Sequence, residues 1–192
     1  MARAFRKWSN GGSITEGVIW QQLLAFFFPI LLGTFFQQLY NTADAMIVGN
    51  FVGKEALAAV GGTTSVLINF FVGLFVGVAS GATVVIAQYF GGRQFEEVRK
   101  ATHTSMALAL AAGAGIMAIG LIFAAPALKA MDTPEDILGH AVTYLRIYFL
   151  GTIPSLLYNM GSGILRAVGD TKRPLYYLIA ACLVNIALDL VF

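Results

Sequence analysis

The sequence contains few charged residues. Only 11% of its 192 residues are Asp, Glu, Lys or Arg, whereas 58% are hydrophobic and the mean hydropathy is +0.76. Soluble domains carry about 25% charged residues, and no segment between the apolar runs is long enough to form a soluble domain. The composition therefore predicts an all-α fold, a polytopic bundle of membrane helices.

Cysteine is almost absent as well. The single residue, Cys182, excludes an internal disulfide and a cysteine-based metal site. The sequence also lacks a nucleophile–base pair, a cluster of metal ligands and a phosphate-binding loop. We therefore expect no enzymatic activity and no cofactor, and we do not expect a nucleic-acid partner.

Five apolar runs are long enough to cross a bilayer, which takes about 20 residues. After a tail at residues 1–17, the spans are predicted at about 18–46, 57–90, 101–128, 137–164 and 174–192. The first run is too long for the core of a signal peptide, so we expect it to be retained. Pro29 and Pro154 are expected kink sites, and Pro126 helps to end the third span. The fifth run is still apolar at Phe192, as in a truncated span.

Glycines in the second run are spaced for helix packing. Gly73, Gly77 and Gly81 follow one another at four-residue intervals and lie on one helical face. Such a strip of small residues lets a second helix approach closely. We therefore expect another helix to pack there.

Lysine and arginine are distributed unevenly among the connections. Nine lie in the tail and in the connections after the second and fourth spans, whereas only Lys54 and Lys129 lie in the other two connections. Basic residues accumulate on the cytoplasmic side of membrane proteins. The pattern predicts a multi-pass protein of the cell (inner) membrane with a cytoplasmic amino terminus.

Two carboxylates occur within apolar runs. Asp44 follows 27 residues, Gly17 to Ala43, without a formal charge, and Asp189 lies deep in the last run. A carboxylate at membrane depth costs about 2.5–3.5 kcal/mol, so it is a functional candidate by default. The predicted orientation places both acids in the outer half of the membrane.

Amide side chains accompany both acids. Asn41 precedes Asp44 by three residues, and Asn185 precedes Asp189 by four and shares its helical face. Carboxylate and amide oxygens suit Na⁺, and a pair of acids also suits a transferable proton. Alternatively, each acid caps a helix end or pairs with Arg146, the only strong base within a span.

Three motifs in this order resemble the amino-terminal lobe of the multidrug and toxic compound extrusion (MATE) transporters. They are Gln37-Gln38-Leu39-Tyr40-Asn41-Thr42-Ala43-Asp44-Ala45-Met46-Ile47-Val48-Gly49 after Pro29, Gly81-Ala82-Thr83-Val84-Val85-Ile86-Ala87-Gln88-Tyr89-Phe90-Gly91, and Leu165-Arg166-Ala167-Val168-Gly169-Asp170-Thr171-Lys172-Arg173-Pro174. In that family twelve helices form two six-helix lobes around a cavity, and organic cations or drugs leave in exchange for H⁺ or Na⁺. The resemblance therefore implies that residues 18–192 form a partial lobe of five spans.

The resemblance also implies roles for individual residues. Asp44, Asn185 and Asp189 correspond to the cation site of the lobe, with Na⁺ as a possible ligand of the two acids. Pro29 corresponds to a proline whose bending accompanies protonation. The residues implied to line the substrate cavity are Gln37, Tyr40, Tyr144 and Asn159.

Three functions remain open at this stage. The first is an H⁺- or Na⁺-coupled antiporter that exports drugs, present here as an incomplete amino-terminal half that needs a carboxy-terminal lobe or an oligomeric partner. The second is a flippase for lipid-linked precursors, which would need a basic groove for phosphates. The third is a short, non-transporting membrane protein that oligomerises through the Gly73, Gly77 and Gly81 strip.

Overall fold

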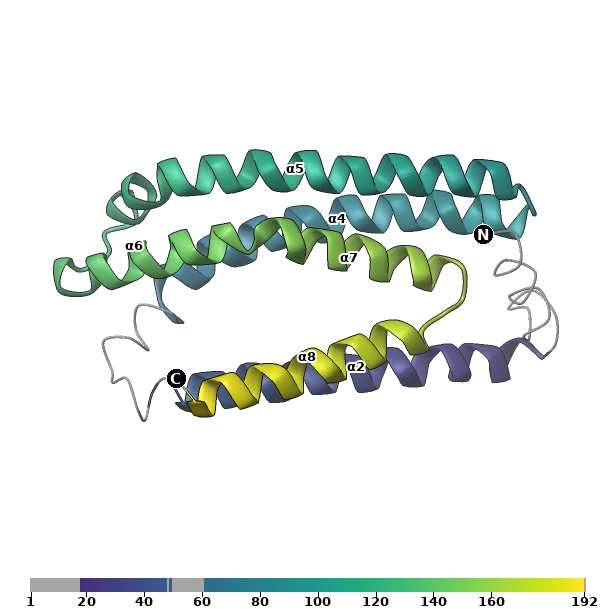
Figure 1. Ribbon diagram of the computed structural model, residues 1–192, viewed down its shortest axis with the longest axis horizontal. Helices are drawn as coiled ribbons and strands as arrows, with labels where there is room; N and C mark the ends of the chain where they lie inside the picture. Colours follow the sequence, from purple (N-terminus) through teal and green to yellow (C-terminus); the bar gives the residue numbers. More distant parts are fainter. Residues whose placement is uncertain (1–17, 48, 50–60, 192) are drawn as a thin grey trace.

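The computed structural model describes residues 18–47, 49 and 61–191. Within these ranges the chain forms α-helices and no strand, which confirms the all-α fold (Figure 1). The helices are α2 (Ile19–Ile47), α4 (Thr63–Gly91), α5 (Phe95–Ala130), α6 (Glu135–Leu150), α7 (Thr152–Ala167) and α8 (Lys172–Val191). Three of them, α2, α4 and α5, are each long and apolar enough to cross a membrane.

The predicted fourth span is divided into two helices. We expected one helix kinked at Pro154, but α6 ends at Leu150, α7 begins at Thr152, and Gly151 lies between them. Pro154 has no N–H to donate to the Leu150 carbonyl, and its ring is crowded against that carbonyl. The interruption therefore falls one turn before the proline.

The end of α5 also differs from the prediction. Pro126 lies inside the helix, which continues to Ala130. The chain leaves the helix at Asp132, whose φ of 52° is in the left-handed region, and the Thr133 N–H reaches back to the Leu128 carbonyl at 3.2 Å. This left-handed turn, rather than the proline, terminates α5.

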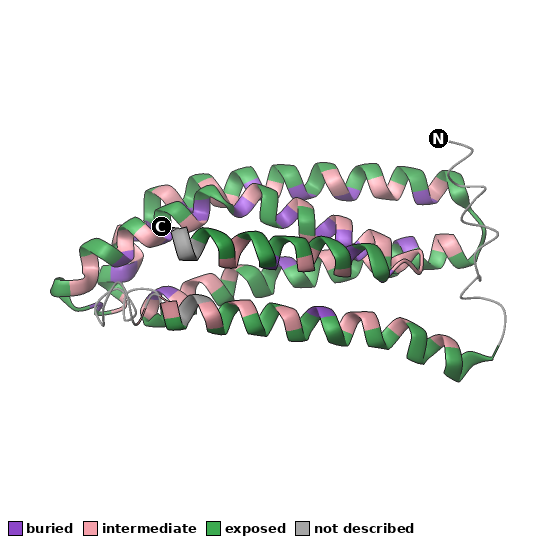
Figure 2. Cartoon of the chain, turned by 60° about the horizontal axis from the view of Figure 1, so that its bottom comes forward, coloured by how far each residue is buried: buried purple, intermediate pink, exposed green. Residues whose placement is uncertain are grey.

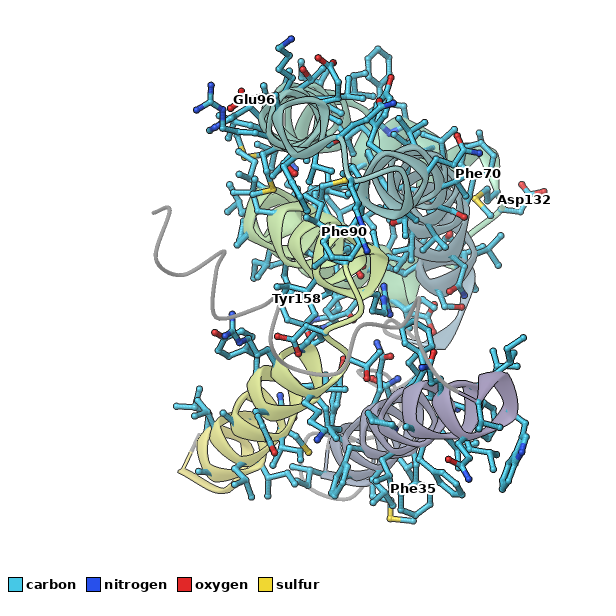
Figure 3. All side chains as sticks on the ribbon, turned by 90° about the vertical axis from the view of Figure 1, so that its right-hand side faces the viewer. Phe35, Phe70, Phe90, Glu96, Asp132 and Tyr158 are labelled. Atoms are coloured by element: carbon cyan, nitrogen blue, oxygen red, sulfur yellow. The ribbon has the colours of Figure 1, made fainter. Side chains whose placement is uncertain are left out.

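The helices form two groups, which we call the four-helix bundle and the helix pair. Helices α4, α5, α6 and α7 pack together as the four-helix bundle, whereas α2 and α8 pack mainly on each other (Figures 1 and 3). The Tyr158 hydroxyl of α7 lies 3.4 Å from the Pro174 carbonyl at the start of α8 and links the two groups. The helix pair thus meets the four-helix bundle near the α7–α8 turn.

The core lies in the four-helix bundle. A cluster of buried side chains joins α5 to α6, and Phe71 of α4 packs edge-on against Phe149 of this cluster with ring centroids 5.4 Å apart. The Phe149 ring occupies the place that a side chain at Gly120 would take. The buried members of the cluster are Ala124, Leu128, Ala141, Leu145 and Phe149.

The expected contact at Gly73, Gly77 and Gly81 is not formed within the described part of the chain. All three are exposed, and a Cβ atom at any of them would have no neighbour within 4 Å. The buried Phe75 and Ile86 point the other side of α4 toward the four-helix bundle. Close helix contacts occur instead at glycines of α5 and α7.

The charged turns and connections lie at the two ends of the molecule. The α4–α5 connection and the α7–α8 turn lie at one end, together with the start of α2, and carry the ion pairs Arg99–Glu96, Lys100–Glu97 and Arg173–Asp170. The α5–α6 turn, with Asp132, lies at the opposite end of the molecule, the end at which α2 and α8 also finish (Figure 1). The helices therefore run in the alternating directions that the charge pattern requires.

Candidate functional site

The helix pair has a defined register, set by a buried glycine. A Cβ atom built on Gly33 of α2 would lie 3.6 Å from Leu178 Cδ2 and 3.8 Å from Leu175 Cδ1 of α8. Both helices run in the same direction, away from the end that carries the α7–α8 turn (Figure 1). Gly33 and Leu178 therefore mark one level at which the two helices touch.

The predicted polar residues of α2 and α8 lie at equal distances along the sequence from this contact. Tyr40 and Asp44 follow Gly33 by seven and eleven residues, and Asn185 and Asp189 follow Leu178 by the same seven and eleven. Residues at these intervals share one helical face, and eleven residues correspond to about 16 Å of helix. The register therefore brings the backbone positions of Asp44 and Asp189 to the same level on the faces that meet.

The side chains of Asp44 and Asp189 lie outside the described part of the structure. Both residues belong to helices whose backbone is described, so the register argument concerns their positions alone. Among the described side chains there is no group of three His, Cys, Asp or Glu that could hold a metal. The cation site remains a prediction from the sequence and the register.

Asn185 shows an unusual feature in the same region. Its Oδ1 atom is buried, and no described residue donates a hydrogen bond to it. A buried acceptor without a partner costs about 1–3 kcal/mol, and such groups in native proteins call for an explanation, such as an ion. An unpaired amide oxygen one turn before Asp189 is a suitable ligand for a hard cation.

The other predicted residues of α2 lie near this face. Gln37 follows Gly33 by four residues and is exposed, and Tyr40 is half-buried. Asn41 is exposed and donates to Gln38 Oε1 at 3.4 Å, so it contacts its own helix. Pro29 lies within α2, which continues through it to Ile47. Its bending remains a prediction.

A cavity of about 210 Å³ lies in the four-helix bundle, beside the break between α6 and α7. Of the residues predicted to line a substrate cavity, Asn159 contributes to it, and its Nδ2 donates to the Ser155 carbonyl at 2.9 Å. Tyr144 is half-buried on α6 and is not among the lining residues. The lining is mainly aromatic and aliphatic, with Phe71, Phe75, Ile116, Tyr148, Phe149, Thr152, Ser155 and Leu156 among its members.

Several cavity residues escaped the sequence analysis. Tyr148 and Ser155 line the cavity, and so does Thr152, whose buried Oγ1 has no hydrogen-bond partner among the described residues. A usable signal was present, because polar side chains recur every three or four residues along one face of the fourth span. They are Tyr144, Tyr148, Thr152, Ser155 and Asn159.

Arg146 lies on another side of α6. It is exposed, whereas Tyr148, two residues later, faces the cavity. Two residues correspond to about 200° of helical rotation, so the two side chains leave α6 in nearly opposite directions. Arg146 therefore does not belong to the cavity.

Apolar helices, polar positions at one level on α2 and α8, and a cavity among the helices are features of integral membrane proteins of the transporter class. The family model described as MatE matches residues 29–191, so the chain belongs to the MATE family of transporters. It corresponds to the amino-terminal lobe of these proteins.

Individual relatives agree with this assignment. The chain is 31% identical to the probable multidrug resistance protein YoeA of Bacillus subtilis over 88% of its own length. It is 26% identical to a protein of Shewanella oneidensis named FAD transporter, over 87% of its own length. It spans 36% of the length of each of these two relatives.

Solved structures of the family share the fold. An outward-facing multidrug resistance MATE transporter matches 93% of the chain with a TM-score of 0.85 and 28% identity, and the match covers 39% of that transporter. Structures of MATE in the straight and bent conformations match with TM-scores of 0.85 and 0.84. The likeness thus extends about equally to both conformations.

Proposed function

We propose that this chain is the amino-terminal lobe of an antiporter that exports small organic cations or drugs in exchange for H⁺ or Na⁺. The observation that supports the proposal is the common register of α2 and α8, from which we infer that the backbone positions of Asp44 and Asp189 share one level, one turn beyond Asn185 with its unpaired oxygen. A proton or Na⁺ would bind there and neutralise charge within the membrane.

The proposed mechanism is alternating access. Ion binding at Asp44 and Asp189 lowers the cost of packing these helix ends against apolar surroundings. The helix pair then repacks, and α2 bends at Pro29, where a backbone hydrogen bond is already missing. Repacking expels the substrate on the side opposite the amino terminus.

The substrate would bind between the helix pair and the cavity of the four-helix bundle. The aromatic lining of the cavity suits a flat or cationic organic molecule, because aromatic faces attract cations. Polar groups for orientation would come from Gln37, Tyr40, Tyr144 and Asn159. The relatives bear names as different as multidrug resistance protein and FAD transporter, so the family alone does not define the substrate.

Transport would take place across the cell (inner) membrane with the amino terminus in the cytoplasm. The basic turns at one end of the helices and the acidic α5–α6 turn at the other support this orientation. A second lobe, or an oligomeric partner, would complete the substrate path between two halves.

A flippase is less well supported. That activity needs a basic groove for phosphates, and Arg146, the strong base within a span, lies away from the cavity. The cavity itself is lined mainly by apolar and aromatic side chains.

The test is ion-dependent stability of the purified chain in detergent. Wild type is expected to unfold at a higher temperature with Na⁺ than with K⁺, or at acidic pH if the ion is H⁺. An ion concentration one hundred times the dissociation constant stabilises the folded chain by about 2.7 kcal/mol. Asp44→Asn should abolish this response and, introduced into the native gene, should abolish efflux of a fluorescent cation from the cells.

Asn185→Leu provides a second variant that separates loss of the ion response from loss of folding. Because it removes a buried acceptor that has no partner, the variant should be at least as stable as wild type without the ion. It should nevertheless lose the ion response. Wild-type efflux in Asp44→Asn, or an undiminished ion response in both variants, would remove the basis of the proposed cation site.

A further inference from the structure

Arg146 carries a charge on the outside of a membrane helix. It lies in the interior of α6 and is exposed. None of the described side chains forms an ion pair or hydrogen bond with it. A guanidinium in the hydrocarbon region costs about 2.5–3.5 kcal/mol unless it reaches water or an anion.

The position of Arg146 on α6 indicates which surroundings it meets. Leu145 is buried in the core and Tyr148 lines the cavity. Arg146 is rotated from them by about 100° and 200°, so it occupies a third face. Within the described part of the chain nothing covers this face at Arg146, and we take it to border the lipid.

The direction of the side chain follows from helix geometry. Arg146 lies eleven residues after Glu135, about 16 Å from the start of α6. Cα–Cβ bonds in a helix tilt toward its amino terminus, and long basic side chains extend toward the membrane surface. The guanidinium is therefore directed to the leaflet at the end that carries the α5–α6 turn.

Space is available along this path. Gly139 lies seven residues before Arg146 on the same face, is exposed, and would have no neighbour within 4 Å of an added Cβ atom. Thr143, between them, folds its hydroxyl back onto the Gly139 carbonyl at 3.0 Å. The surface beside Gly139 is thus open, one to two turns above Arg146 on the same face of α6.

We propose that this face of α6 binds a phospholipid of that leaflet, with its phosphate on the Arg146 guanidinium and its headgroup over Gly139. A guanidinium binds phosphate through two parallel hydrogen bonds, which satisfies the charge at this depth. An anionic headgroup is favoured over a zwitterionic one, since the latter adds a second cation. This site is separate from the proposed cation site and from the cavity.

Native mass spectrometry of the chain tests the proposal, after reconstitution in phosphatidylcholine vesicles that contain phosphatidylglycerol. Wild type is expected to retain one phosphatidylglycerol, and Arg146→Gln to retain it about tenfold less. Arg166→Gln, at the far end of α7, is the matched control and should retain it as wild type does. Gly139→Leu fills the open space beside Gly139 without removing charge and should also lose the lipid.

Several results would overturn the lipid site. They are equal retention by wild type and Arg146→Gln, equal loss in Arg166→Gln, or full retention in Gly139→Leu. A second protein chain that is retained by wild type and lost with Arg146→Gln would show that protein covers this face. Circular dichroism of each variant establishes that the helices are formed.

Discussion

In the four-helix bundle, side chains of one helix fill the space that glycines leave on another, whereas α2 and α8 meet along one narrow face. Gly113 lies against Ile153 and Leu156, and Gly120 against Phe149. In the helix pair the corresponding contact is Gly33 with two leucines. Figure 2 shows that most of α2 and α8 is exposed, while buried residues concentrate in the four-helix bundle.

The difference separates a rigid part from a part that can move. Closely interlocked helices have few alternative arrangements, because packed interiors tolerate little change in shape. The helix pair has few such contacts with the four-helix bundle and contains the two acids of the proposed cation site. An ion bound at this proposed site would therefore act on the loosely attached part without remodelling the core.

The largest expected effect is an all-or-none cross-link within the helix pair. Tyr40→Cys and Asn185→Cys, combined in a Cys182→Ala background, should form a disulfide on mild oxidation. Both positions follow the Gly33–Leu178 contact by seven residues, so they share one level on the facing sides of α2 and α8. The disulfide forms if their Cα atoms approach to about 4.4–6.8 Å. Gel mobility or the mass of a tryptic digest reports the bond.

The control moves one cysteine by a single residue. Leu39→Cys with Asn185→Cys should remain unlinked, since one residue rotates the side chain by about 100°. A cross-link of equal yield in both pairs would show that α2 and α8 lack the register inferred here.

The next largest expected effect is a loss of stability in the four-helix bundle. Gly120→Ala places a methyl group into the Phe149 ring and should destabilise the chain by about 3 kcal/mol. The measurement is the midpoint of unfolding in mixed micelles with increasing sodium dodecyl sulfate. Gly115→Ala lies on the same helix in open space and should leave stability unchanged or raise it by up to about 1 kcal/mol. Similar midpoints for both variants would contradict the interlocked packing.

The smallest effect concerns the turn that joins the two parts. Asp170 Oδ1 accepts the Arg173 N–H at 3.1 Å and thus caps the start of α8. Asp170→Ala should cost about 1 kcal/mol, the usual value of an amino-terminal cap. Asp170→Asn keeps an acceptor and loses only the ion pair with the half-exposed Arg173 side chain, which is worth less. Equal losses of stability for Asp170→Ala and Asp170→Asn in the same unfolding assay would show that the charge of Asp170, rather than its capping hydrogen bond, stabilises the turn.

Hydropathy and charge predicted much of this architecture. Long apolar runs correspond to helices, because a chain in lipid must satisfy its backbone hydrogen bonds within each segment. The side chains Pro29, Tyr40 and Asn185 could be singled out because polar or helix-breaking residues are rare in such runs. What periodicity alone does not reveal is the side of a helix on which its neighbour lies.

The glycines illustrate this limit. Gly73, Gly77 and Gly81 have the regular spacing, yet the close contacts form at Gly113, Gly120 and Gly163. Which glycines are covered depends on the large residue that the partner helix offers opposite them, such as Phe149 for Gly120. That complementarity joins residues far apart in the sequence, so the local pattern does not contain it.

The interruption at Gly151 has a consequence for spectroscopy. Since Pro154 cannot donate to the Leu150 carbonyl, this carbonyl stretches at a higher frequency than the hydrogen-bonded carbonyls around it. A ¹³C label at Leu150 would isolate its infrared band beside the α6–α7 cavity. Because Phe149 and Gly151 on either side of it line the cavity, the band would report on changes there without any dye attached to the protein.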